Sequence, residues 1–250
     1  MVKGVAVQFK GYEETIPKML ELIKFGEELK KHGKIVLKPN IFENSEINKT
    51  RAEFVEPVLR FCMENKAPGA EVFIADGADG KDTMDVFEKE GYKKLAEKYG
   101  IGLVDLNKTE LTEKQSDEFL RFDEIHYPKI LEESFVISLP AFGKHEELQF
   151  SGALSNMIGA FPASKYKGFL SRRKNKLDGV PKKYQVHDIL KCKMPNFSVA
   201  DASENGKIYA GQPLEIDKQG TRLFGVDWKE VPYLRLVDES FNTPRIQKET

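Results

Sequence analysis

Residues 34–40 read KIVLKPN, and this stretch decides the fold that we predict. Its central residues, Ile35 to Leu37, are apolar, and Lys38-Pro39-Asn40 closes the run with the fixed φ of a proline, as is typical of a buried strand that ends in a stiff turn. Helix-period segments precede it at Glu13–Lys31 and follow it at Ala52–Asn65. A short apolar strand between two amphipathic helices predicts a βαβ unit in a parallel sheet.

The same alternation of short apolar runs and helix-period segments extends along the rest of the chain. We therefore predict one α/β domain over residues 1–250, with a mostly parallel or mixed sheet flanked by helices. A polar stretch at residues 109–118 interrupts the pattern, and a basic loop region lies at about residues 163–183. Further strands are expected at 3–9, 71–76, 101–106, Phe135–Leu139 and Phe197–Asp201, and further helices at Thr83–Tyr99, near His187 and at Val226–Val237.

The balance of charge argues against a general attraction to polyanions. The chain has 39 basic and 40 acidic residues, a formal net charge of -1, so its overall field pulls it toward neither nucleic acid nor an anionic membrane. Its apolar runs are far shorter than the roughly 20 residues that span a bilayer, and its first residues lack the pattern of a secretion signal. We expect a cytoplasmic protein with no membrane partner.

Several common cofactor and catalytic patterns are absent from the sequence. The two cysteines, Cys62 and Cys192, stand far apart without a CxxC pair, so this chain alone holds neither an iron-sulfur cluster nor an all-cysteine zinc site. The GxxxxGK[ST], GxGxxG and GxSxG patterns are also missing, which argues against ordinary ATPases, Rossmann dehydrogenases and α/β-hydrolases. The cofactor stays unknown at this stage.

Polar side chains follow the predicted strands, where an open parallel sheet has its ligand crevice. Lys38, Asp76, Lys144 and Asp201 all stand at or soon after a strand end. Aspartate at such a place often caps the next helix, but lysine caps no helix start, so Lys38 and Lys144 are more informative. Their ammonium groups can pair with a phosphate or carboxylate, or act as nucleophile or base when buried. The alternative for Lys38 is a surface lysine that reaches into solvent.

The segment SGALSNMIG at residues 151–159 begins with a helix-capping serine and opens on small residues. Such a start leaves main-chain N–H groups facing an anion, although a purely structural cap is the alternative. Cations flank the segment in the sequence, with Lys144 and His145 before it and Lys165 and Lys167 after it. We predict that a ligand is bound by Asn40, Ser151, Gly152, Ser155, Asn156, Lys165 and Lys167.

His145 is the histidine that stands beside these groups, and acid-base catalysis or hydrogen bonding is its first interpretation. With Lys38 and Lys144 it completes the set of predicted catalytic residues. No HxH or HExxH spacing is present, so a divalent metal needs ligands from separate loops. The candidate metal ligands are His145, Asp76 and Asp201.

The run SRRKNK at residues 171–176 is the one feature that suggests nucleic acid. Tyr166, Phe169 and Tyr184 stand near it and are able to stack on bases. The chain has no recognisable nucleic-acid-binding motif, however, and its total charge is balanced. A solvated loop or a lid over an anionic ligand is therefore the favoured interpretation.

These motifs, in this order, resemble the domain-of-unknown-function family 362, which is widespread in anaerobic bacteria and archaea. The resemblance implies an uncharacterised prokaryotic protein. Many members carry a ferredoxin-type cluster module that this sequence does not contain, so the resemblance leaves a separate ferredoxin as one option for a partner. The similarity covers nearly the whole chain and rests on Lys38-Pro39-Asn40 with Thr50, FVISLP at 135–140 leading to Lys144 and His145, residues 151–159, Asp201-Ala202 and LFGVDW at 223–228.

Three positions depart from the family pattern. Members usually have lysine where Ser155 stands and histidine shortly after Lys165, where Phe169 and Ser171 stand here; the glycine-rich loop after Asp201 is shortened to residues 203–207. If these positions are catalytic in the family, this member has altered or lost activity. The SGxxK-like pattern after a Lys/His pair also resembles the nickel-pincer lactate racemases, whose cofactor is tethered to a lysine, and Ser155 occupies the place of that lysine.

Three hypotheses follow from these observations. The first is a protein, enzyme or not, that binds an anionic small molecule or cofactor at the strand ends, with a divalent metal as an option. The second is a non-catalytic binding or scaffolding module that works with a ferredoxin-type partner. The third, nucleic-acid binding through residues 172–176, ranks last.

Overall fold

The computed structural model describes residues 2–41 and 48–242, and a seven-stranded sheet runs through its centre. Five neighbouring strands are parallel, whereas β11 is antiparallel to both β10 and β1. The predicted α/β fold with a mostly parallel sheet is therefore confirmed. In spatial order the strands are β1 (Gly4–Gln8), β11 (Lys207–Gly211), β10 (Phe197–Ala202), β7 (Phe135–Leu139), β2 (Lys34–Pro39), β3 (Glu71–Asp76) and β4 (Gly102–Asp105).

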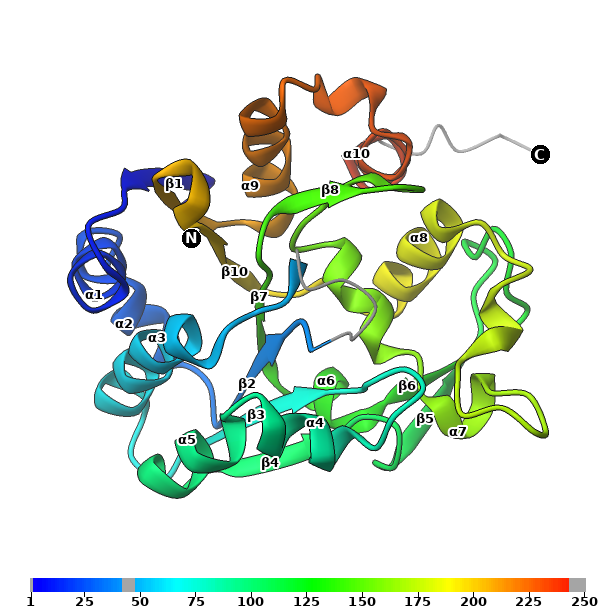
Figure 1. Cartoon of the computed structure of the whole chain (residues 1–250), viewed down its shortest axis with the longest axis horizontal. Coiled ribbons are helices and arrows are strands. Elements are labelled where there is room, and N and C mark those ends of the chain that lie inside the picture. The colour runs from blue at the N-terminus through cyan, green and yellow to red at the C-terminus, as the bar shows by residue number, and fades with distance from the viewer. Residues whose placement is uncertain (1, 42–47, 243–250) are drawn as a thin grey trace.

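Helices cover both faces of the sheet, and Figure 1 shows α1, α2 and α3 on one side with α8, α9 and α10 on the other. Successive side chains of a strand point to opposite faces. In β2, Ile35 and Leu37 join the first core and Val36 joins the second, so Lys38 points to the second face. The helices are α1 (Tyr12–Leu22), α2 (Phe25–Leu29), α3 (Ala52–Asn65), α4 (Thr83–Lys89), α5 (Tyr92–Tyr99), α8 (Lys182–Cys192), α9 (Pro213–Gly220) and α10 (Pro232–Asn242).

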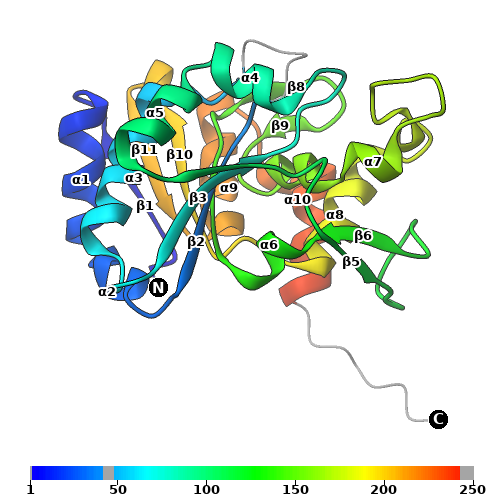
Figure 2. The same cartoon turned by 90° about the horizontal axis from the view of Figure 1, so that it is seen from below.

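Smaller elements connect these layers. The hairpin of β5 and β6 lies on the side of α8 (Figure 2), and a second hairpin, β8 with β9, follows β7. The basic region 163–183 contains two short helices, α7 and η3, rather than loop alone. No helix in the described ranges combines the length and the apolar character needed to cross a bilayer. These elements are β5 (Leu111–Lys114), β6 (Ile125–Pro128), α6 (Lys129–Glu133), β8 (Gly143–His145), β9 (Gln149–Ser151), η2 (Ser155–Ala160), α7 (Ala163–Tyr166) and η3 (Asn175–Leu177).

Two predicted helices are each divided in the structure. The helix expected over Glu13–Lys31 breaks at Lys24, whose φ of 56° is left-handed, and the one over Thr83–Tyr99 breaks at Gly91, with φ 84°. A left-handed residue ends the run of αR geometry, so a new helix starts after each break. The helix predicted over Val226–Val237 starts only at Pro232, after the 3₁₀ turns η5 (Thr221–Phe224) and η6 (Trp228–Glu230).

The loop after Asp201 is a tight hairpin. One 3₁₀ turn, η4 (Ser203–Asn205), and Gly206 with φ 71° reverse the chain, and β11 then pairs with β10. Neither β11 nor the following α9 was predicted from the sequence. Together they add an antiparallel strand and bring Asp217 against the second face of the sheet.

The order of the strands indicates where a ligand crevice is expected. From β2 the chain adds β3 and β4 on one side and then returns to β7 on the other side of β2. The direction of strand addition reverses between β2 and β7. In open α/β sheets ligands bind at such a reversal, outside the carboxyl ends of the two strands.

Candidate functional site

A cavity of about 390 Å³ opens at the carboxyl ends of β2 and β7. Segments that are far apart in the sequence meet around it, because the turns after β2, β3 and β7 all reach the same edge of the sheet. Six of the predicted site residues line it: Asn40, Lys144, His145, Ser151, Ser155 and Asn156. Asn48, Asp79, Glu146, Arg173, Lys174, Asp178, Lys182 and Gln185 supply the other polar groups of the lining.

Lys38 lies beneath this cavity and is fully buried. Its Nζ donates to Asp76 Oδ1 at 2.7 Å and to Asn156 Oδ1 at 3.2 Å. Asp76 also accepts the N–H groups of Ile41 and Gly77, both at 2.9 Å. The ion pair ties the end of β2 to the end of β3 and sets the position of Asn156. Lys38 is therefore not a surface lysine, and its charge is balanced within the protein.

Two glycines allow the main chain to approach this ion pair. A Cβ atom at Gly159 would lie 2.6 Å from Asp76 Oδ1 and 2.8 Å from Lys38 Nζ, and one at Gly77 would lie 2.9 Å from the carbonyl oxygen of Gly159. The main chain of Gly77 thus lies against the carbonyl oxygen of Gly159. The carbonyl oxygens of both glycines accept hydrogen bonds from Lys174.

Lys174 is buried in the lining of the cavity, although the sequence placed it in a solvated basic run. Its Nζ donates to Gly77 O at 3.0 Å and to Gly159 O at 3.3 Å, and its main-chain N–H donates to Asp79 Oδ1 at 2.6 Å. Burial lowers the pKa of Lys174 to about 8, which the charge of Asp76 opposes only in part. Sequence reasoning missed this residue. The sequence contains one indication that Lys174 is buried. It stands three residues before the apolar Leu177, a spacing that places the two side chains on the same, inner side of a helical turn.

His145 has its ring held on the rim of the cavity. The N–H groups of Glu147 and Leu148 donate to Nδ1 at 3.2 Å each, and Lys182 Nζ lies 3.3 Å from Nε2. Partial burial, and then the charge of Lys182, lower the pKa of His145. Both effects favour the neutral imidazole.

The predicted metal ligands His145, Asp76 and Asp201 are not brought together. Asp76 belongs to the Lys38 ion pair, and Asp201 accepts the hydroxyl of Tyr12 at 2.7 Å and the N–H of Ser203 at 2.9 Å. Among the described residues these three do not form a group of close metal ligands, and each side chain is held in a separate hydrogen-bond network. The rule that ligands bind at the carboxyl ends of strands identifies the edge of the sheet. It does not give the distances between side chains that stand at the ends of different strands.

The segment from Ser151 to Asn156 departs from the predicted helix start. Ser151 ends β9, and the turn η2 begins only at Ser155. The N–H groups of Ala153 and Leu154 donate to the two oxygens of Asp217, at 2.7 and 2.9 Å. An anion site of main-chain N–H groups does exist here, but a carboxylate of the chain itself occupies it. Burial raises the pKa of Asp217 to about 7.

Lys165 and Lys167 are exposed and do not line the cavity. The Lys165 carbonyl oxygen accepts a hydrogen bond from Lys176 Nζ, which draws the two ends of the basic loop together. Arg173 faces Asp79 at 3.8 Å. With Lys174 buried, the run at 171–176 does not present a continuous cationic face.

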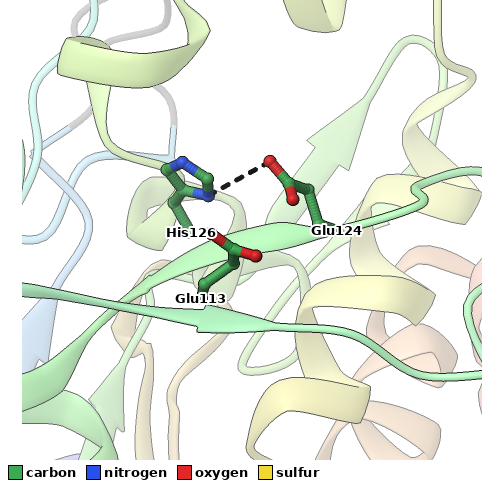
Figure 3. A group of neighbouring side chains, drawn as sticks. All are labelled: Glu113, Glu124 and His126. Carbon is green, nitrogen blue, oxygen red and sulfur yellow. Dashed lines mark ion pairs between the residues drawn. The ribbon is translucent and has the colours of Figure 1, made fainter.

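A separate group of possible metal ligands lies on the hairpin of β5 and β6. Figure 3 shows Glu113, Glu124 and His126, the one such group of three among the residues that the structure describes. Glu113 stands opposite His126 in the strand register, and His126 Nδ1 lies 3.8 Å from Glu124. None of the three lines the cavity. Both glutamates are exposed, so we interpret the group as ordinary surface side chains in which His126 pairs with Glu124, its neighbour along the chain.

A second hollow, of about 480 Å³, is lined by Arg222 and residues 225–229. This lining comes from one short segment between α9 and α10. It gathers no side chains from separate strand ends and does not lie at the strand-order reversal. The cavity at β2 and β7 therefore remains the candidate site.

Comparison with known proteins identifies a family and a fold. The family model described as "Domain of unknown function (DUF362)" matches residues 35–227. No curated protein matches the chain. Among solved structures, the lactate racemase apoprotein from Thermoanaerobacterium thermosaccharolyticum is similar, with a TM-score of 0.52 and 13% sequence identity over 92% of this chain and 58% of that one. The chain thus spans little more than half the length of that neighbour, and the likeness concerns the fold.

A cofactor tethered to lysine does not fit position 155. The Ser155 hydroxyl accepts the N–H of Gly152 at 2.9 Å and donates to the carbonyl oxygen of Gly152 at 3.2 Å. A serine hydroxyl has no amine that could form a covalent bond to a cofactor in the way a lysine does. We derive no chemistry through a tethered group at this position.

Proposed function

The chain belongs to the DUF362 family, and from its geometry we propose that it binds a small molecule with a carboxylate or phosphate group in the cavity at β2 and β7. The observation that carries this proposal is Lys174. A buried ammonium is costly unless it is paired, and both of its acceptors within the described ranges are main-chain carbonyls. One of its three N–H donors is left for a ligand.

More exposed cations supply the rest of the attraction. Lys144 is exposed and Lys182 is partly exposed, and both belong to the same lining. The hydroxyl of Ser151, buried at the same wall, adds a neutral donor. A volume of about 390 Å³ lies within the ordinary range for small-molecule sites. Lys174 at the floor and Lys144 and Lys182 nearer the solvent together favour an elongated anion.

Replacing Lys174 with Met is expected to weaken binding by about tenfold or more. A hydrogen bond to a charged group contributes about 1.5–3 kcal/mol, and 1.4 kcal/mol corresponds to a factor of ten. The change removes a buried charge and keeps an apolar stem, so the fold should persist. The measurement is isothermal titration of pyruvate, lactate, citrate and phosphate into both proteins at pH 7.

The matched control is Lys93→Met, which removes an exposed lysine that pairs with Glu88 far from the cavity lining. It should leave every affinity unchanged. Lys144→Met should have a smaller effect than Lys174→Met, because an exposed charge is screened by water. The proposal would be refuted if Lys174→Met bound each of the four anions with the same affinity as the unchanged protein.

A further inference from the structure

The cavity contains a buried primary amine, and we propose that Lys174 forms an imine with the carbonyl carbon of a 2-oxo acid. This inference rests on the proposed function and narrows its ligand class to carboxylates that carry a neighbouring ketone or aldehyde. The ketone would face Lys174 at the floor of the cavity. The carboxylate would face Lys144 and Lys182 in the more exposed part of the lining.

The two buried lysines at this edge of the sheet differ in the groups that accept their N–H hydrogen bonds. Lys38 Nζ lies 2.7 Å from a carboxylate oxygen of Asp76 and forms a buried ion pair with it. Lys174 Nζ instead meets the carbonyl oxygens of Gly77 and Gly159. Carbonyl oxygens accept N–H groups of the neutral amine as well as of the ammonium. Lys174 can therefore lose a proton without leaving a buried carboxylate unpaired.

The acidity of the group agrees with this geometry. Burial lowers the pKa of Lys174 to about 8, so roughly a tenth of the molecules carry the neutral amine at pH 7. For an exposed lysine with an ordinary pKa near 10.4, that fraction is roughly two hundredfold smaller. Only the neutral amine is a nucleophile, and desolvation in a pocket is one established way to activate it.

The reaction balances without any further reagent. The amine nitrogen attacks the carbonyl carbon, a C–N bond forms, and one N–H proton is transferred to the carbonyl oxygen to give a carbinolamine. The second N–H proton leaves with that oxygen as water, which breaks the C–O bond and leaves the imine, with no oxidation or reduction. His145 lines the same cavity, but its Nδ1 accepts the N–H groups of Glu147 and Leu148 and its Nε2 faces Lys182, so we assign it no part in this proton transfer.

The test is to equilibrate the protein with pyruvate at pH 7, quench with sodium borohydride, and map the reduced adduct by mass spectrometry of peptides. We expect one adduct, at Lys174, at an occupancy about tenfold or more above that of any exposed lysine, given the difference in neutral amine. Lactate, which has a hydroxyl in place of the ketone, should compete without forming an adduct. Lys93→Met should be labelled like the unchanged protein.

The other outcomes show whether the imine alone fails or whether anion binding fails as well. If pyruvate binds in a Lys174-dependent way but the quenched protein carries no adduct there, the imine is wrong and the anion site stands. Labelling spread over exposed lysines, with Lys174 unmodified, likewise overturns the imine. If none of pyruvate, lactate, citrate and phosphate binds, the proposed function itself fails. The peptide map of the unchanged protein decides the matter even if a Lys174 variant does not fold.

Discussion

Replacing Lys38 with Met will lower the free energy of unfolding by about 3–5 kcal/mol, the usual cost of leaving one partner of a buried ion pair unpaired. The side chains of Lys38 and Asp76 are 0% and 3% exposed, so water cannot reach the carboxylate that remains. The N–H groups of Ile41 and Gly77 stabilise it only in part. Urea unfolding at pH 7, followed by circular dichroism, measures the difference.

Two further variants test the cause of this loss. Adding Asp76→Asn to Lys38→Met removes the unpaired charge, so the double variant should be more stable than the single one. Lys93→Met breaks an ion pair with Glu88 whose side chains are 49% and 63% exposed, and should cost less than about 1 kcal/mol. If Lys38→Met costs no more than this exposed control, the ion pair does not have the structural role described above.

Replacing Asp217 with Asn will remove a pH dependence of stability. Burial raises the pKa of Asp217 from 3.8 to about 7 in the folded protein. Between these values the folded state keeps a proton that the unfolded state has lost, so the contribution of Asp217 is full below pH 4 and falls until about pH 7. At 1.36 kcal/mol per pH unit the total loss is about 4 kcal/mol.

Asparagine does not titrate, so the comparison of the two proteins isolates this contribution. The unfolding free energy of the unchanged protein minus that of Asp217→Asn should be about 3 kcal/mol larger at pH 5 than at pH 8. Urea titrations of both proteins at the two pH values provide the four numbers. A difference that stays constant with pH would show that Asp217 is charged throughout and that its two N–H donors outweigh its burial.

The strands of the central sheet were predictable from local patterns. The runs at 34–39, 71–76 and Phe135–Leu139 have the bounds that the structure shows, because each is a short apolar stretch. The break at Lys24 was not predictable, because it lies within a continuous helix-period pattern and the left-handed φ of a lysine leaves no mark in the sequence. The break at Gly91 lies within a similar pattern, but glycine commonly ends a helix in this conformation, so the sequence did contain a signal for it.

The location of the cavity was also predictable, whereas its internal chemistry was not. Carboxyl ends of parallel strands meet at one edge, and this rule brings Asn40, Lys144 and Ser151 to one lining. The partners depend on pairings that are distant in the sequence: Asp76 reaches Lys38 through the neighbouring strand β3, and Asp217 arrives on a helix that was not predicted. Charge alone could not distinguish the buried Lys174 from its exposed neighbours.

The central claim is that an anionic ligand binds in the cavity at the ends of β2 and β7, against Lys174. The measurement that tests it most directly is a crystal structure of the protein with the tightest-binding anion of the titrated panel. The account predicts a ligand oxygen or carbonyl carbon in direct contact with Lys174 Nζ, and an anionic group facing Lys144 or Lys182. A ligand found in the hollow of residues 222–229, with the cavity unfilled, would contradict it.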